Sequence, residues 1–198
     1  DDGSSAWTVN NRYDAQPLKV RIEALMMLEP ADSPNGVVAE DFQAQGLVTA
    51  AAENVTTSFA PEPSPEGAPA GSGPWIRYTG ASKRDVANGA WTKLARKYEP
   101  SKNWKDKMGL GVWVKGDGQG GLLNIQLRSP EHTVYRGDGD HYITLDFTGW
   151  RYCELVEPDS DRIEDYQWPY GGAYSVYREF VDYSDVSDMT FYLNNLPA

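Results

Sequence analysis

A run of glycines that begins at Gly116 has the GxGxxG spacing of a nucleotide-phosphate loop, within "GVWVKGDGQGGLLNIQLRS" (residues 111–129). Such a loop binds a pyrophosphate when a helix begins at its last glycines, because the helix amides then point at the phosphate. Residues 122–129 instead alternate apolar and polar side chains, which indicates a strand. A kinase-type glycine loop would need HRD and DFG motifs, which the chain lacks. The glycines therefore predict a hairpin turn, with Asp117 capping backbone amides.

Two acidic clusters have a spacing that could bind a metal ion. Asp138 and Asp140 alternate within "RGDGDH", and Asp159 and Asp161 alternate within "EPDSDRIED". Calcium takes about six to eight oxygen ligands, often from alternate residues of a turn. Neither cluster has the glycine and glutamate positions of an EF-hand loop. Because the chain has 29 acidic residues, the clusters predict either a calcium site or solvated turns.

Residues suited to catalysis are sparse. The two histidines, His132 and His141, flank one turn, where we expect a solvated or turn-capping role. Glycoside hydrolysis needs two carboxylates about 5 to 10 Å apart, and the acids Asp146 and Glu154 come from one strand region that does not fix their separation. The motifs GxSxG and HExxH are absent. The sequence therefore predicts a protein that is not an enzyme.

Composition limits the remaining classes. The chain has 198 residues with 19 Gly, 13 Pro and 12% aromatic residues, which favours one core of short strands joined by turns. A formal net charge of −11 would repel nucleic acid. A lone Cys153 excludes an intrachain disulfide, and no apolar run approaches the roughly 20 residues that span a bilayer. We expect an all-β protein without nucleic-acid binding or a membrane span, processed or excised from a longer chain.

The predicted organisation is a short arm and one domain with a long loop. Residues 1–14 are polar and predict an N-terminal arm, and residues 15–198 predict a single domain. Residues 17–28 alternate apolar and charged side chains as a half-buried strand does, although several of them also fit one face of a helix. Residues 60–74, "APEPSPEGAPAGSGP", hold five Pro and three Gly and predict an extended loop.

Four later segments alternate apolar and polar residues with the period of a strand. They are residues 109–116, 122–129, 141–150 and 188–196. The first two flank the glycine run. The apolar positions of all four predict one core, made of Leu110, Val112, Val114, Leu123, Ile125, Leu127, Ile143, Leu145, Phe147, Met189, Phe191 and Leu193.

Three of these stretches, "GLGVWVKGDGQGGLLNIQL", "HYITLDFTGWRYCEL" and "DVSDMTFYLNNLP", resemble the strands of carbohydrate-binding modules with the galactose-binding-like jelly-roll fold. Such modules are appended to bacterial polysaccharide-degrading enzymes, and the likeness covers about residues 75–198. The resemblance implies an antiparallel two-sheet β-sandwich that binds sugar on a concave face or at the loops of one end. It also implies a structural calcium, a tethered catalytic domain, and a secreted or cell-surface/periplasmic location.

Sugar binders combine aromatic rings, which pack on the C–H face of a pyranose, with planar polar groups that bond to its hydroxyls. On the strand faces opposite the predicted core, the candidates are Trp113, Gln126, Arg128, Asp146, Tyr192 and Asn194. Aromatic residues in loops predict an exposed platform, and the candidates are Trp75, Trp104, Tyr135, Trp168 and Tyr170. The alternative is that the strand residues fill a semi-buried layer under loops, which we favour for Trp113.

Together with the resemblance, these residues predict a non-catalytic carbohydrate-binding module, and the resemblance implies that it holds a parent polysaccharide-degrading enzyme on its glycan. Weak binding on a preformed β surface would be amplified by the tether. One alternative is a structural spacer or docking sandwich without sugar binding, because a fold does not by itself imply a function. A further alternative is a polysaccharide-active enzyme of jelly-roll fold. Exposed aromatic residues gathered on one surface would favour the binder, whereas scattered ones would favour the spacer.

Overall fold

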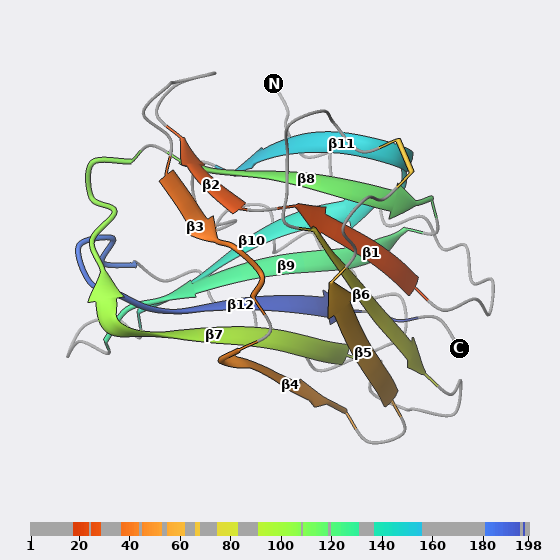
Figure 1. Cartoon of the computed structure of the whole chain (residues 1–198), viewed down its shortest axis with the longest axis horizontal. Helices are drawn as coiled ribbons and strands as arrows, with labels where there is room; N and C mark the ends of the chain where they lie inside the picture. The colour runs from red at the N-terminus through yellow and green to blue at the C-terminus, as the bar shows by residue number, and fades with distance from the viewer. Residues whose placement is uncertain are drawn as a thin grey trace, which may run out of the picture.

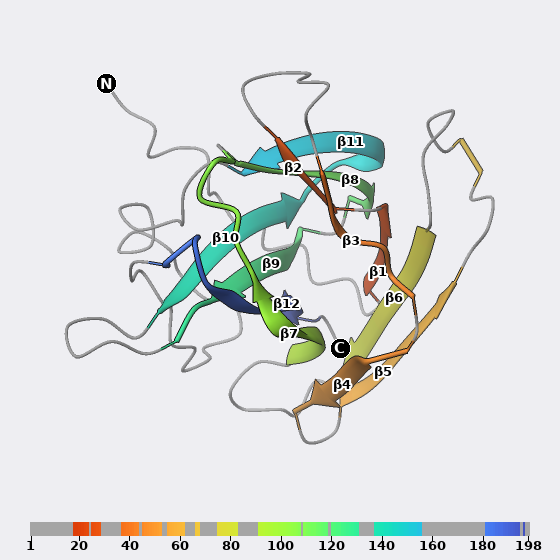
Figure 2. The same cartoon turned by 60° about the vertical axis from the view of Figure 1, so that its left-hand side comes forward.

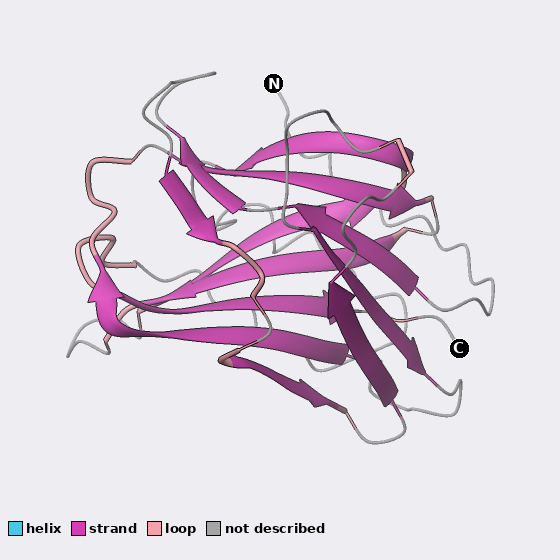
Figure 3. Cartoon of the chain, viewed as in Figure 1, coloured by secondary structure: helices cyan, strands magenta, loops and turns pink. Residues whose placement is uncertain are grey.

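A computed structural model describes the fold. It describes residues 18–23, 25–28, 37–43, 45–52, 55–61, 66–67, 75–82, 91–107, 109–118, 120–130, 137–155, 181–194 and 196. Within these ranges every regular element is a strand (Figure 3). No helix long and apolar enough to cross a bilayer occurs in the described part of the chain.

The strands form two antiparallel sheets. Sheet A has the order β3-β2-β8-β1-β6-β5, with β11 on the other side of β8. Its strands are β1 (Leu18–Glu23), β2 (Leu25–Leu28), β3 (Val37–Glu40), β5 (Val55–Pro61), β6 (Trp75–Ser82), β8 (Gly109–Asp117) and β11 (Thr148–Leu155). Sheet B has the order β10-β9-β12-β7-β4. Its strands are β4 (Leu47–Ala51), β7 (Trp91–Lys102), β9 (Gly121–Arg128), β10 (Asp138–Leu145) and β12 (Val186–Asn194).

The two sheets pack face to face as a β-sandwich (Figures 1 and 2). All neighbouring strands with a register run antiparallel. The edge strands β4 and β5 lie side by side in both views, so the sheets also meet along one edge. The predicted all-β, two-sheet antiparallel sandwich is confirmed.

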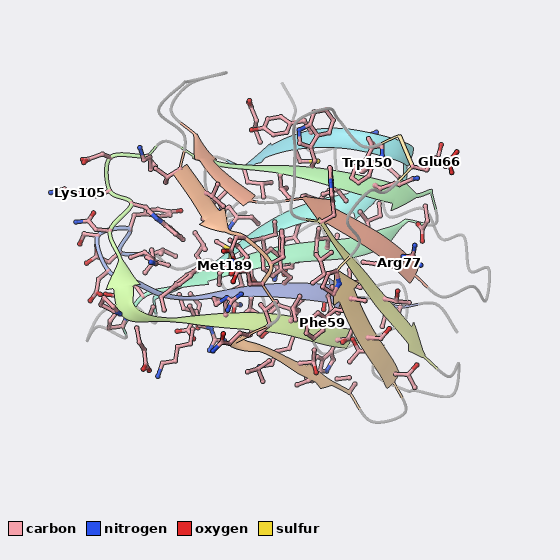
Figure 4. The ribbon with its side chains drawn as sticks, viewed as in Figure 1. Phe59, Glu66, Arg77, Lys105, Trp150 and Met189 are labelled. Atoms are coloured by element: carbon pink, nitrogen blue, oxygen red, sulfur yellow. The ribbon has the colours of Figure 1, made fainter. Side chains whose placement is uncertain are left out.

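The core between the sheets is the one that the alternation predicts. All twelve predicted core residues are buried, with exposed fractions between 0% and 8%. Met189 lies in the middle of the molecule (Figure 4), and the ring of Phe191 packs 5.5 Å from that of Phe42. Burying one such side chain contributes about 1.5 to 3 kcal/mol. The alternating polar residues are left to the outward faces of the two sheets.

The hairpin predicted at the glycine run is wrong. Strands β8 and β9 lie in different sheets, so the glycines carry the chain across the sandwich. Gly118 and Gly120 both have a φ of 77°, a conformation that glycine adopts without strain. Alternation reveals which side of a strand is buried but not which strand pairs with it, and for this reason the sequence could not distinguish a hairpin from a crossing.

A second crossing lies beside the first. The single strand predicted over residues 141–150 is divided at Asp146–Phe147 into β10 of sheet B and β11 of sheet A. The amide of Gly120 donates to the carbonyl oxygen of Leu145 at 3.0 Å. A Cβ atom at Gly116 would lie 2.3 Å from the carbonyl oxygen of Phe147. Glycine is therefore required there, because any side chain would separate the two crossings.

The early strand prediction is confirmed, since residues 17–28 contain β1 and β2 and no helix among the described residues. The first two residues of the loop predicted at 60–74 belong to a strand, because β5 continues to Pro61. A proline is tolerated there because β5 is an edge strand. Strands on both sides of this loop pair with one another, as β1 and β5 do with β6. The predicted arm, residues 1–14, lies outside the described residues.

Candidate functional site

The outward face of sheet B, which we call the polar face, gathers hydrogen-bonding side chains from four strands. The registers place residues of β7, β9, β10 and β12 opposite one another in the phase that the core does not use. The polar face consists of Trp91, Lys93, Ala95, Lys97, Leu122, Asn124, Gln126, Arg128, Asp138, Asp140, Tyr142, Thr144, Asp188, Thr190, Tyr192 and Asn194.

Asp140 is the centre of a hydrogen-bond network on the polar face. Its Oδ1 accepts from Asn124 Nδ2 and from Gln126 Nε2, each at 2.8 Å. Its Oδ2 accepts from the hydroxyl of Tyr142 at 3.2 Å. Asp140 is 1% exposed, and a buried carboxylate is tolerated when donors surround it in this way. The network therefore fixes three neighbouring side chains before any ligand arrives.

Arg128 stands at one end of this network. Its Nε lies 2.9 Å from Gln126 Oε1 and 3.0 Å from Asp138 Oδ1, so two acceptors share one donor. Its side chain is 41% exposed, whereas that of Asp138 is 10% exposed. Asp188 lies opposite Arg128 in the register between β9 and β12. Carboxylates thus flank the guanidinium, while the other cations of the face, Lys93 and Lys97, lie on β7 opposite Tyr192 and Asp188.

Tyr192 and Trp91 supply aromatic surface beside the network. Both are half-buried, and their ring centroids are 6.3 Å apart in an edge-on arrangement. On the same face the buried Oγ1 of Thr144 has no hydrogen-bond partner among the described residues. The polar face thus combines ring surface, planar amides, carboxylates and a guanidinium.

The outward face of sheet A, which we call the aromatic face, is built differently. Trp75 and Trp150 pack with ring centroids 4.5 Å apart, and Trp113 and Tyr152 pack at 5.3 Å. The indole Nε1 of Trp150 donates to the backbone oxygen of Glu66 at 3.2 Å, so the two residues lie together (Figure 4). The rings on this face thus contact one another, and a turn of the loop between β5 and β6 covers one of them.

Comparison with known proteins decides what kind of domain this is. The model of the carbohydrate binding domain, family 11, matches residues 31–194. The chain belongs to family 11 of the carbohydrate-binding domains. The predicted resemblance to carbohydrate-binding modules is confirmed, as is the prediction that the function of the domain is to bind carbohydrate.

A mannan endo-1,4-beta-mannosidase of Bifidobacterium adolescentis is 33% identical to this carbohydrate-binding domain over 90 residues. The matched stretch is 44% of this chain and 8% of that enzyme. The similarity therefore concerns a small part of a long protein. No solved structure matches the chain.

The strand residues predicted to contact sugar separate into two groups. Gln126, Arg128, Tyr192 and Asn194 come together on the polar face of sheet B. Trp113 lies on the aromatic face of the other sheet, half-buried against Tyr152. Gln126 and Asn194 are only 2% and 5% exposed, so of these four Arg128 and Tyr192 offer surface to a ligand. The sugar contacts stay predictions.

Two predicted positions are corrected. Asp146 follows the end of β10 instead of lying within a strand face, and its Oδ1 is 3.8 Å from Arg151 Nη1. Trp104 is not an exposed platform, because it is 6% exposed and its ring packs edge-on to Tyr98 at 5.6 Å. Its amide donates to the carbonyl oxygen of Tyr183 at 2.6 Å, which places this loop against the core.

Other aromatic predictions have mixed outcomes. Trp75 is 4% exposed at the start of β6, so it is not an exposed loop residue. Tyr135, Trp168 and Tyr170 lie outside the described residues. The exposed loop platform that the sequence predicts therefore finds no support at Trp75 or Trp104.

The carboxylates predicted to bind calcium are used in another way. Asp138 and Asp140 lie in β10, not in a turn, and protein donors occupy oxygens of both. Across the described ranges, no group of three or more His, Cys, Asp or Glu residues has an arrangement that could hold a metal ion. Asp138 and Asp140 therefore do not fit calcium, whereas Asp159 and Asp161 lie outside the described residues.

The described titratable residues offer poor catalytic groups. His141 is 1% exposed in β10, so the predicted turn-capping role is wrong. Burial lowers its pKa, partly opposed by the hydrogen bond between Nδ1 and the oxygen of Ile125 at 2.9 Å. Burial also raises the pKa of the Cys153 thiol to about 11. A buried neutral imidazole and an un-ionised thiol fit a structural role in a binding domain.

Sequence reasoning missed several residues of the polar face. Asn124 precedes Gln126 and Arg128 in the same alternating phase, and Tyr142 occupies the matching phase of β10. The two-residue alternation of these strands alone could have identified both as residues of the outward face. The role of Asp140 was hidden, because its two amide donors come from another strand, and a strand register is not visible in the alternation.

Proposed function

We propose that the polar face of sheet B is the sugar-binding surface of this domain and that its ligand is a neutral polysaccharide. The observation that carries the proposal is the network around Asp140, which holds amide, phenol and guanidinium groups in fixed positions on one sheet. Sugar hydroxyls both donate and accept hydrogen bonds, and preformed partners bind them with little ordering cost.

The charges of the polar face support a neutral ligand. Asp138 and Asp188 flank Arg128 from the neighbouring strands. Lys97 lies opposite Asp188 on β7, where Glu99 pairs with its amine at 2.9 Å, and the whole chain carries a net charge of −11. A uronic acid would approach Arg128 only by coming close to these carboxylates. Since like charges in proximity are unfavourable, the arrangement favours hydroxyl groups over carboxylates.

The rings of Tyr192 and Trp91 support stacking at the same surface. Each is half-buried, so part of each ring is available to the C–H face of a pyranose.

The relative suggests the first glycan to test. It is a mannan endo-1,4-beta-mannosidase, so we propose a β-1,4-linked mannan as the leading candidate. We also propose that this domain is tethered to a catalytic domain and works outside the cell, where long polysaccharides occur. The tether would convert weak single-site affinity into long residence on the polymer.

The proposal is tested by affinity electrophoresis of the domain in gels that contain soluble mannan, mixed-linkage glucan, xylan or polygalacturonate. Retardation by a neutral polymer that is lost in Arg128→Ala but kept in Trp113→Ala would support the proposed surface. Unretarded migration in every gel would contradict sugar binding by the isolated domain and favour a spacer. Retardation lost in Trp113→Ala and kept in Arg128→Ala would move the site to sheet A.

A chelator in a second set of gels tests the predicted calcium. Among the residues that the sequence predicts as ligands, Asp159 and Asp161 are the candidates that the structure leaves. Weaker retardation with chelator, restored by added calcium, would support a calcium site there. Equal retardation in both sets would contradict a calcium requirement for binding.

A further inference from the structure

We propose that Asp140 and Gln126 are positioning residues, which act on the sugar through Arg128 and not by contact of their own. The inference rests on the proposed function of the polar face. The sequence predicted calcium binding for Asp140 and sugar contact for Gln126. The inference instead gives both residues one role, which is to orient Arg128.

The first step is the chemistry of Asp140. An ionised carboxylate accepts hydrogen bonds and donates none, so the amide groups beside it must present their NH2 ends. Asn124 and Gln126 do so, each at 2.8 Å. This removes the ambiguity between the oxygen and nitrogen ends of both amides. Once Nε2 of Gln126 points to Asp140, Oε1 of Gln126 must point the other way.

The second step leads from Gln126 to Arg128. The outward-turned Oε1 accepts from Arg128 Nε at 2.9 Å. Gln126 is 2% exposed, whereas the side chain of Arg128 is 41% exposed. Gln126 therefore has both ends engaged within the protein and little surface for a ligand, while the residue that it holds extends into solvent.

The third step concerns what Arg128 has left to offer. Its contacts to Gln126 and Asp138 both use Nε. Within the described part of the chain, Nη1 and Nη2 make no hydrogen bond of their own. These two nitrogens form a planar fork that matches two neighbouring acceptors, such as adjacent hydroxyl oxygens of one pyranose. Fixing Nε holds this fork in one orientation, which spares the ordering cost of a long side chain on binding.

The test is a double-mutant cycle on the whole domain, with binding of mannohexaose measured by calorimetry. Arg128→Ala is expected to lower the affinity about tenfold to a hundredfold, the range for a hydrogen bond to a charged group. Gln126→Met is expected to lower the affinity by a comparable factor in the wild-type background. In the Arg128→Ala background it should add less than about twofold, because the residue through which it acts is gone. Independent, multiplying losses would overturn the inference.

Variants of Asp140 test whether the acceptor oxygen, and not the charge, is what matters. Asp140→Asn keeps an oxygen that can accept from both amides and an NH2 that can donate to the Tyr142 hydroxyl. It should therefore bind within about threefold of wild type, whereas Asp140→Leu should lose as much as Gln126→Met. Asp146→Asn, a carboxylate off the polar face, is the matched control and should change nothing. A loss of binding in Asp140→Asn equal to that in Asp140→Leu would overturn the role of the acceptor.

A ligand-free measurement separates this inference from the proposed function. The Nε–Hε signal of Arg128 in NMR spectra should be slow to exchange with water in the wild type and in Asp140→Asn. In Gln126→Met and Asp140→Leu it should shift and exchange faster. An unchanged signal would overturn the inference, even if mannohexaose binds. A changed signal without binding of any neutral oligosaccharide would keep the positioning role and contradict the proposed function.

Discussion

The two outward faces of this sandwich arise from the same alternation and end in opposite chemistry. On the aromatic face, Trp75 packs on Trp150 and Trp113 packs on Tyr152, with centroids 4.5 and 5.3 Å apart. On the polar face, two amides and a phenol surround Asp140. The guanidinium that Gln126 and Asp138 hold is partly exposed. One face therefore packs its rings on one another, whereas the other uses a buried hydrogen-bond network to hold one partly exposed guanidinium.

The difference teaches that aromatic content does not by itself locate a sugar site. A tryptophan that stacks on a neighbour has used the surface that a pyranose would need. Trp150 has also used its indole donor, since Nε1 bonds to the oxygen of Glu66. Lys115 Nζ donates to the same oxygen at 3.0 Å. We therefore read the aromatic face as a structural layer that secures a loop and the polar face as the recognition surface.

The largest expected effect tests the structural reading of the aromatic face. Trp150→Ala removes a half-buried indole together with its contacts to Trp75 and Glu66. It should lower the free energy of unfolding by about 2 to 4 kcal/mol and leave the affinity for a neutral polysaccharide unchanged. Chemical denaturation and affinity electrophoresis below the unfolding transition measure the two quantities. Weaker binding by the still-folded variant would contradict the comparison.

The next effect is expected on the polar face. Tyr192→Ala removes a half-buried ring beside Trp91 and should lower sugar affinity about tenfold, which corresponds to about 1.4 kcal/mol. Tyr152→Ala is the matched control, because it removes a half-buried tyrosine from the aromatic face. Calorimetry with the same oligosaccharide compares the two variants. Equal losses in both would show that the faces do not divide their roles.

Acid should weaken sheet B through His141, which lies in β10 on the core side. Burial holds the pKa of this residue below its unfolded value of 6.5, so the unfolded chain takes up a proton that the folded chain excludes. The stabilisation is complete above pH 6.5 and is lost as the pH falls below it, by at most about 1.4 kcal/mol per pH unit. Thermal unfolding from pH 7 downward should show this slope, and His141→Gln should flatten it. A slope that persists in the variant would assign it to other groups.

The smallest expected effect concerns the charge of the ligand. Asp188 lies opposite Arg128 in the register of β12 and β9, and Asp188→Asn removes one negative charge without changing the shape of the side chain. Binding of polygalacturonate should improve by roughly twofold to fivefold at low salt, since exposed charges contribute up to about 1 kcal/mol, while binding of a neutral polymer stays unchanged. The improvement should disappear at high salt, where such charges are screened. Improvement that is equal for neutral polymers would show that Asp188 does not act by its charge.

Most of the fold could be predicted from the sequence because burial imposes a period of two on each strand. Leu123, Ile125 and Leu127 are buried as the alternation predicts. Strand pairing was not predictable: the segments before and after the glycine run have the same pattern, yet they lie in different sheets. Partner strands depend on contacts far apart in the sequence, which the local pattern does not encode.

The candidate site could be predicted in part for the same reason. The phase of β9 places Gln126 and Arg128 on one outward face, and the phase of β12 places Tyr192 and Asn194 on another. The structure joins the two faces because β9 pairs with β12. The placement of Trp113 on the opposite sheet, and the use of Asp140 by amides rather than by a metal, depend on neighbours that only the folded chain supplies.

The most direct test of the central claim is an NMR titration of the domain with mannohexaose, because each face has its own side-chain reporters. We predict that the amide signals of Asn124 and Gln126 and the Nε signal of Arg128 shift with one common affinity, while the indole signals of Trp113 and Trp150 stay in place. Shifts confined to those two indoles would contradict the account, because they would place the sugar on sheet A.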